Sequence, residues 1–288
     1  MGKQWWRGGV VLLVLCAGWL AAEAQAPAPQ SPDLTGLAHI ALRVSDVDTE
    51  VNFFGKMGFE EAFTNVLNGH ALQVFIKVND MQFIEIYPRT DPNQPLGFLH
   101  ACYQSANLNK LNARYAAAGL RPTPVHTAAA GNLLFSLLGP DSRTLEFTQY
   151  MPGSRQMNDK GQHLGESRVS DEMLGFELPV TNVEAAGNFY GKLGFDAEPD
   201  GANVRLSVPA NPDLRIELHA EKAGDQPQFL FPVDDAKRAA DELHHAGLKV
   251  VRDKKLVFLR DPDGNSFVLL QTGESGHSSR RSLIPWKR

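Results

Sequence analysis

Two histidines and two glutamates stand at matching points of a repeated pattern in this chain of 288 residues. They are His39 in LAHIALRV, Glu85 in FIEIYP, His100 in GFLHACYQ and Glu146 in RTLEFTQY. Each lies in a short apolar run of the kind that forms a β-strand. Imidazole and carboxylate groups together suit a divalent metal such as Zn, Ni, Mn or Fe(II). No pair of them forms a local metal motif, so the prediction of one shared site depends on the elements that carry them.

Those elements repeat along the chain. Residues 41–60 (ALRVSDVDTEVNFFGKMGFE) align with residues 177–196 (ELPVTNVEAAGNFYGKLGFD) at an offset of 177 − 41 = 136. In each copy a strand leads through a polar pair, Ser-Asp or Thr-Asn, that predicts the N-cap of a helix. Apolar residues follow at helical spacing, and Gly58 or Gly194 ends the helix. Each copy therefore predicts a strand followed by an amphipathic helix.

Weaker copies of the same pattern lie inside each half. Residues 100–122 and 228–250 again read as strand, helix and glycine, and each helix is followed by strand-like runs, including RPTPVHT at 121–127. The repeat predicts four βαβββ modules paired into two tandem α+β domains. Each domain should be a curved mixed sheet with helices on its outer face.

Strand periodicity places the candidate ligands on one face of the first sheet, because alternate residues of a strand point to opposite sides. The apolar faces should lie under the helices, so the other faces should line a concave cavity that holds the four ligands. The same faces carry the candidate substrate-binding residues Arg43, Lys77, Phe83 and Tyr87. Arg43 and Lys77 could recognise an anionic group such as a carboxylate.

The composition, with 43% hydrophobic and 21% charged residues and a net charge of −5, is that of a soluble globular protein. No nucleic-acid partner is expected, because dense basic runs are absent before the last few residues. Lys3 and Arg7, an apolar run and Ala22-Glu23-Ala24 predict a cleaved signal peptide and a periplasmic or secreted protein without a stable membrane anchor. Cleavage would remove Cys16, leaving Cys102 without a disulfide partner.

The predicted organisation follows from these boundaries. The segments are a signal peptide (1–24), a Pro/Ala-rich tether (25–35), the first domain (36–150), a linker (151–172), the second domain (173–272) and a flexible tail (273–288).

The paired modules, with His, Glu, His and Glu at these positions, resemble the vicinal oxygen chelate superfamily. It includes glyoxalase I, methylmalonyl-CoA epimerase, extradiol dioxygenases, and the fosfomycin and bleomycin resistance proteins. The NFxGKxGF segments, the DPDGN turn and LEFTQ are similar to family sequence over most of both predicted domains. The resemblance implies that the first and last strands of the first domain's two modules supply His39, Glu85, His100 and Glu146 to one metal. It also implies open positions for two neighbouring oxygens of a small-molecule substrate.

The second domain departs from the family pattern. In chain order, the positions of the four ligands are taken by Gly175, Glu217, Gln228 and Val268. Its metal site is therefore interpreted as degenerate and metal-free. Its cavity could still hold Glu177, Arg205 and His219, and so bind a ligand or cap the first domain.

The leading functional hypothesis is an exported, metal-dependent isomerase or lyase of the glyoxalase or epimerase type. The metal would act as a Lewis acid beside a carbonyl, and Glu85 or Glu146 would be the catalytic base. An Fe(II) ring-cleaving dioxygenase using His39, His100 and Glu146 is the second hypothesis, against which Glu85 counts as a fourth ligand. A non-catalytic small-molecule binding or resistance protein is the third. A homodimer is possible under all three.

Overall fold

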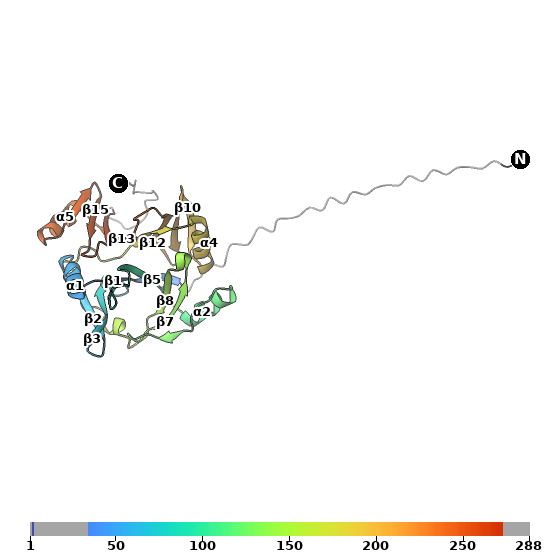
Figure 1. The fold of residues 1–288 in the computed structure, drawn as a ribbon, viewed down its shortest axis with the longest axis horizontal. Coiled ribbons are helices and arrows are strands. Elements are labelled where there is room, and N and C mark those ends of the chain that lie inside the picture. The colour runs from blue at the N-terminus through green and yellow to red at the C-terminus, as the bar shows by residue number, and fades with distance from the viewer. Residues whose placement is uncertain (1, 3–33, 273–288) are drawn as a thin grey trace.

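The computed structural model describes residue 2 and residues 34–272. The predicted signal peptide, nearly all of the predicted tether and the predicted tail lie outside these residues. Within them, two eight-stranded sheets follow one another along the chain, as Figure 1 shows. The predicted fold class, two tandem α+β domains built from βαβββ modules, is confirmed. No helix in the described part is long and apolar enough to cross a membrane.

The first sheet contains two modules. Their elements are β1 (Leu34–Val44), α1 (Val47–Lys56), β2 (Glu60–Leu67), β3 (His70–Lys77), β4 (Phe83–Pro88), β5 (Gly97–Ser105), α2 (Leu108–Ala117), β6 (His126–Thr127), β7 (Leu133–Leu138), the 3₁₀ turn η1 (Pro140–Ser142) and β8 (Thr144–Gln149). Of the predicted strand at 121–127 only the last two residues pair. Pro122 and Pro124 explain the difference, because proline has no N–H for a strand ladder.

A short helix, α3 (Arg155–Asn158), lies in the linker before the second sheet. The second sheet repeats the order of the first. Its elements are β9 (Gly175–Val180), α4 (Val183–Leu193), β10 (Asp196–Asp200), β11 (Asn203–Val208), β12 (Asn211–Ala220), β13 (Gln228–Val233), α5 (Ala236–His245), β14 (Val250–Asp253), β15 (Leu256–Arg260) and β16 (Ser266–Gln271).

Local sequence explains where the paired helices begin and end. The Asp46 side chain accepts a hydrogen bond from Thr49 N at 2.7 Å, and that of Asn182 accepts one from Ala185 N at 2.9 Å. Each side chain satisfies a backbone donor that the first helical turn leaves free. Gly194 ends α4 with φ 96°, a left-handed conformation that glycine adopts without strain.

The strand order is the same in both sheets and sets the position of the site. In the first it is β2-β3-β4-β1-β5-β8-β7-β6, with β1 parallel to β4, β5 parallel to β8, and β1 antiparallel to β5. The four central strands, β4, β1, β5 and β8, are those that carry the four candidate ligands. The first and last strand of each module are therefore neighbours at the centre of the sheet.

The two domains share one apolar core. In Figure 1, α1 lies at the left end and α4 at the right end of the boundary between the domains. The ring of Phe54 on α1 lies 5.5 Å from that of Phe267 on β16, and the ring of Tyr103 on β5 lies 5.0 Å from that of Phe195. Because Tyr103 and His100 point to opposite faces of β5, the second domain packs on the side of the first sheet away from the candidate ligands.

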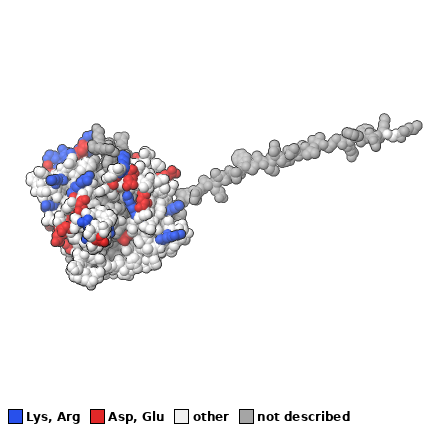
Figure 2. All heavy atoms as spheres, viewed as in Figure 1, with Lys and Arg blue, Asp and Glu red and all other residues white. Residues whose placement is uncertain are grey.

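Acidic and basic side chains are interspersed over the face of the molecule shown in Figure 2. Mixed charge of this kind keeps a surface soluble without creating a strong local field of one sign.

Candidate metal centre

Strand register brings the four candidate ligands into one cluster. Ala41, on β1, pairs with Glu85 on β4 and with His100 on β5, so its neighbour on the same face, His39, lies between them. Glu146 on β8 pairs with Cys102 on β5, two residues after His100. The backbone thus collects residues 39, 85, 100 and 146 at the middle of one sheet face, as the sequence predicted.

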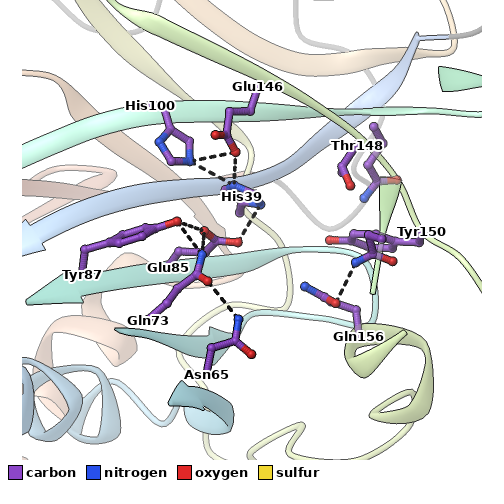
Figure 3. A network of polar contacts seen from close by, with 12 residues as sticks. His39, Asn65, Gln73, Glu85, Tyr87, His100, Glu146, Thr148, Tyr150 and Gln156 are labelled. Carbon is purple, nitrogen blue, oxygen red and sulfur yellow. Dashed lines mark hydrogen bonds and ion pairs between the residues drawn. The ribbon is translucent and has the colours of Figure 1, made fainter. Parts of the chain in front are cut away.

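Three side-chain atoms converge at the centre of this cluster (Figure 3). Nε2 of His39 lies 3.3 Å from Nε2 of His100, and Oε2 of Glu146 lies 3.3 Å from the latter and 3.8 Å from the former. Ligands about 2.0–2.2 Å from one ion would lie about 2.8–3.6 Å apart at angles of about 90–110°. The two separations of 3.3 Å fall within this range, and the third, at 3.8 Å, exceeds it slightly. A small side-chain shift would therefore let the three atoms bind a single metal ion.

Glu85 occupies a different position. Its Oε1 lies 3.2 Å from Nδ1 of His39, the ring nitrogen that does not face His100 and Glu146. Its Oε2 accepts hydrogen bonds from Gln73 Nε2 at 2.5 Å and from the Tyr87 hydroxyl at 3.1 Å. A carboxylate behind a metal-binding histidine holds the N–H tautomer that leaves the opposite nitrogen free to coordinate.

The protonation equilibria also suit a cation. Burial lowers the pKa of His100 to about 4, so this imidazole is neutral and can coordinate at neutral pH. Burial opposes protonation of His39 as well, but the carboxylates of Glu85 and Glu146 raise its pKa. Burial raises the pKa of Glu85. Without a metal, a proton on His39 would balance the buried carboxylates, and a metal ion would compete with that proton.

A second set of ligand-competent atoms includes Cys102, which lies with His39 and Glu146 within 4.8 Å. Burial, with the nearby carboxylates of Glu146 and Glu85, raises the pKa of the Cys102 thiol well above its usual value. Cys102 is 0% exposed and pairs with His39 on β1 and with Glu146 on β8, so it borders the ligand cluster.

The four candidate substrate-binding residues have different surroundings. Phe83 is buried against Phe63 and Phe75 and forms an apolar wall beside the ligands. The hydroxyl of Tyr87 contacts Glu85 rather than open space. Arg43 is partly exposed, and its Nη1 donates to Pro95 O at 3.1 Å.

Lys77 does not recognise an anion in the cavity. Its side chain is 0% exposed, and its Nζ lies 2.8 Å from Asp159 Oδ2 and 3.0 Å from Asp80 Oδ1. It also donates to the backbone oxygen of Asp159 at 2.6 Å. Lys77 thus fastens the linker to β3, and its interpretation as a substrate-binding residue is corrected.

Sequence reasoning missed two residues near the site. Asn65 on β2 hydrogen-bonds to Gln73, and Arg155 in the linker hydrogen-bonds to Asn65. The parity of Phe63 and Asn65 on one strand could have placed Asn65 on the concave face. Arg155 had no such signal, because no strand or long helix carries it.

In the second domain, Val268 lies in an apolar cluster with Leu230, Leu256 and Leu270. Within the described residues, both groups of potential metal ligands lie in the first domain.

Comparison with known proteins gives one match to the second domain and a likeness in fold over both domains. Residues 172–269 match the family model "Glyoxalase/Bleomycin resistance protein/Dioxygenase superfamily". Solved structures with this fold align with both domains. The predicted resemblance to the vicinal oxygen chelate superfamily is confirmed. The match covers the second domain, whose candidate ligand positions are changed, whereas the candidate metal centre lies in the first domain.

Three solved structures illustrate the likeness. The Mn(II)-bound glyoxalase from Novosphingobium aromaticivorans is 15% identical, with a TM-score of 0.63 and coverage of 82% of each chain. The 2,3-dioxygenase LapB from Pseudomonas sp. KL28 is 17% identical, with a TM-score of 0.62, covering 84% of this chain and 93% of that one. An extradiol ring-cleaving dioxygenase from B. fuscum is 13% identical, with a TM-score of 0.64 and coverage of 88% and 75%.

At these identities the likeness concerns the fold alone. No curated protein sequence matches the chain significantly.

Proposed function

We propose that this protein is a metal-dependent enzyme in which His39, His100 and Glu146 hold one divalent ion. The observation that carries the proposal is the convergence of two Nε2 atoms and one carboxylate oxygen at 3.3–3.8 Å. Glu85 contacts Nδ1 of His39, on the other side of the ring from these three atoms. A metal held by three groups keeps positions open for two adjacent oxygens of a small molecule.

The reaction that this set supports best is O₂-dependent cleavage of a catechol-like ring by a bound Fe(II). Two histidines and one carboxylate with open positions are typical of non-haem Fe(II) oxygenases. Bound iron would supply the redox chemistry with O₂. The objection that Glu85 occupies a coordination position is weakened, because Glu85 contacts the far side of His39. The aromatic wall of Phe63, Phe75 and Phe83 beside the ligands suits a flat apolar ring.

An isomerase or lyase of the glyoxalase or epimerase type is the second candidate. It is favoured by the group of potential ligands that contains Glu85, whose ligand atom lies within 4.8 Å of those of His39 and His100. If Glu85 coordinates as a fourth ligand, Glu146 can leave the metal and act as the base. The Glu146 side chain is 18% exposed, which allows it to meet a substrate in the cavity.

Metal analysis of the purified protein tests the shared part of both candidates. We expect about one equivalent of metal, lost in His39→Ala and in Glu146→Ala. His70→Ala, at an exposed histidine of β3, is the matched control and should keep the metal. Protein that binds no metal even after reconstitution would contradict the enzyme proposal and leave the non-catalytic binding protein.

Activity assays separate the two reactions. The dioxygenase proposal expects O₂ consumption and a yellow ring-opened product from simple catechols only with Fe(II). The alternative expects turnover of a hemithioacetal or an epimerisable α-carbon with Ni, Zn or Mn and without O₂. Turnover of the second kind alone would overturn the dioxygenase proposal.

Export is proposed from the N-terminal sequence. Lys3 and Arg7, the apolar run and the small-x-small site at residues 22–24 support cleavage after Ala24. The test is N-terminal sequencing of protein from the exported fraction, which should begin at Gln25. Protein that retains Met1 in the cytoplasm would contradict export.

A further inference from the structure

Hydrogen bonds form a continuous chain from the linker to His39. Arg155 Nη1 donates to Asn65 Oδ1 at 2.8 Å, and Asn65 Nδ2 donates to Gln73 Oε1 at 3.0 Å. Gln73 Nε2 donates to Glu85 Oε2 at 2.5 Å, and Glu85 Oε1 meets Nδ1 of His39 at 3.2 Å. Figure 3 shows the inner part of this chain, from Asn65 to His39. It connects a residue outside both sheets to a candidate metal ligand.

The hydrogen bonds between Arg155 and Glu85 all run in one direction, from donor to acceptor, starting at Arg155. A guanidinium group has only donors, so Asn65 must turn its oxygen to Arg155 and its NH₂ to Gln73. Gln73 then presents its NH₂ to Glu85, whose carboxylate accepts at both oxygens. The proton of His39 is therefore held on Nδ1, and the lone pair stays on Nε2. That is the nitrogen that faces His100 and Glu146.

Arg155 is held in place independently of this chain. Its Nη1 also donates to Thr64 O at 2.8 Å, and its backbone N–H donates to Ala130 O at 2.8 Å. Its guanidinium lies 4.4 Å from the centre of the Phe63 ring, a distance suited to a cation–π contact. These contacts fix an exposed arginine over the inner residues, of which Asn65 and Glu85 are buried.

We propose that Arg155 is a positioning residue for the metal centre, acting through Asn65, Gln73 and Glu85 on the tautomer and orientation of His39. Hydrogen bonds in such a chain polarise one another, so a charged donor at its start strengthens the hydrogen bond that Gln73 donates to Glu85. That bond favours the ionised carboxylate, which can only accept from the His39 N–H. Partners that orient a ligating histidine commonly change metal affinity by about 10–100-fold. The inference rests on the proposed metal site but not on either proposed reaction.

Titration with Co²⁺, monitored by its visible d–d bands, tests the proposal without any substrate. Gln73→Leu and Arg155→Met should each weaken Co²⁺ binding by about 10–100-fold and change the band pattern. The double variant should bind no more weakly than Gln73→Leu alone, because Arg155 acts through Gln73. Asn65→Leu interrupts the chain at a second point and should behave alike. Arg155→Lys, which keeps a donor for Asn65, should recover part of the affinity.

Gln156→Met is the matched control in the same short helix. Gln156 is buried and accepts a hydrogen bond from Asn132 at 2.7 Å, outside the chain. This variant should lower the melting temperature of the metal-free protein without weakening Co²⁺ binding. Two results would overturn the proposal and show that Arg155 only stabilises the linker. One is that the affinity losses of Arg155→Met and Gln73→Leu add in the double variant. The other is that Gln156→Met weakens Co²⁺ binding as much as they do. Normal Co²⁺ binding by His39→Ala would instead overturn the metal site itself.

Discussion

A carboxylate beside a metal-binding histidine can have either of two roles, depending on which ring nitrogen it contacts. Glu85 meets Nδ1 of His39, whereas Glu146 lies on the side of Nε2. The first geometry orients a ligand and makes it more basic, and the second supplies a ligand. Two glutamates that look equivalent in sequence therefore have separate roles in the proposed centre.

Conservative substitution separates these roles. Glu85→Gln should retain one metal equivalent with affinity lower by about 10–100-fold, because an amide holds the His39 N–H less strongly. Glu146→Gln should lose the bound metal, since it removes a charged ligand. Isothermal titration calorimetry with Mn²⁺ measures both. Equal loss of binding in the two variants would show that Glu85 is a direct ligand.

Among the elements, the linker is held against β2 and β3 by polar contacts rather than by its own stability. Its helix, α3, has only four residues, too few to be stable alone. Lys77 of β3 binds the residue that follows the helix, Asp159, by a buried ion pair. The linker can therefore hold Arg155 in place only while sheet contacts keep α3 folded.

Removal of Lys77 should expose this dependence. Lys77→Met leaves the 7%-exposed Asp159 carboxylate with the His163 imidazole at 2.5 Å as its remaining partner, so we expect a loss of about 3 kcal/mol in the free energy of unfolding. Urea denaturation measures the loss, and limited proteolysis should cut the linker sooner. Lys237→Met, in the exposed pair with Asp241 on α5, is the control and should change neither. An unchanged denaturation midpoint for Lys77→Met would contradict the fastening role.

At the scale of the whole molecule, corresponding turns clamp the two domains to each other. The Asp263 carboxylate accepts hydrogen bonds from Ser45 N at 2.7 Å and Ser45 Oγ at 2.6 Å. The Asp141 carboxylate likewise accepts from the backbone N and the hydroxyl of Thr181. Ser45 and Thr181 are related by the repeat offset, since 181 − 45 = 136. Each domain thus caps the strand–helix junction of the other.

A buried acid, Glu50, lies beside the clamp formed by Ser45 and Asp263. Glu50 on α1 is 0% exposed, and neither of its oxygens has a hydrogen-bond partner among the described residues. Burial and the neighbouring Asp261 and Asp263 carboxylates raise the pKa of Glu50 to about 9. The corresponding residue of the second domain, at 50 + 136, is Ala186. We therefore expect the clamp between Ser45 and Asp263 to weaken as pH rises.

This asymmetry predicts the pH dependence of stability. The folded protein holds the Glu50 proton up to pH about 9, whereas the unfolded chain releases it near 4.5, so stability falls as pH rises between these values. Glu50→Gln should remove this loss, which at about 1.4 kcal/mol per pH unit reaches about 6 kcal/mol by pH 9 and corresponds to about 12–24 °C in melting temperature. Glu184→Gln, at an exposed acid in the first turn of α4, is the control. Parallel melting curves for wild type and Glu50→Gln from pH 5 to 9 would contradict the prediction.

Local sequence patterns were enough to predict the elements and the sheet face that carries the candidate site. Strand parity and capping are local, so His39, Glu85, His100 and Glu146 were placed on one surface without coordinates. The same reasoning placed the helices between the predicted N-caps and the terminal glycines. It overextended the strand at 121–127, where two prolines interrupt the ladder.

The roles of the polar residues depend on contacts between segments that are distant in sequence. Lys77 shares its face with the ligands but meets Asp159, which is 82 residues away in sequence. Arg155 reaches Asn65 across 90 residues, and Glu85 meets one nitrogen of His39 rather than the other. These outcomes depend on how the linker folds back and on which atoms are left to satisfy buried charges. The periodicity of a single strand contains no information about either, because both are set by contacts between distant segments.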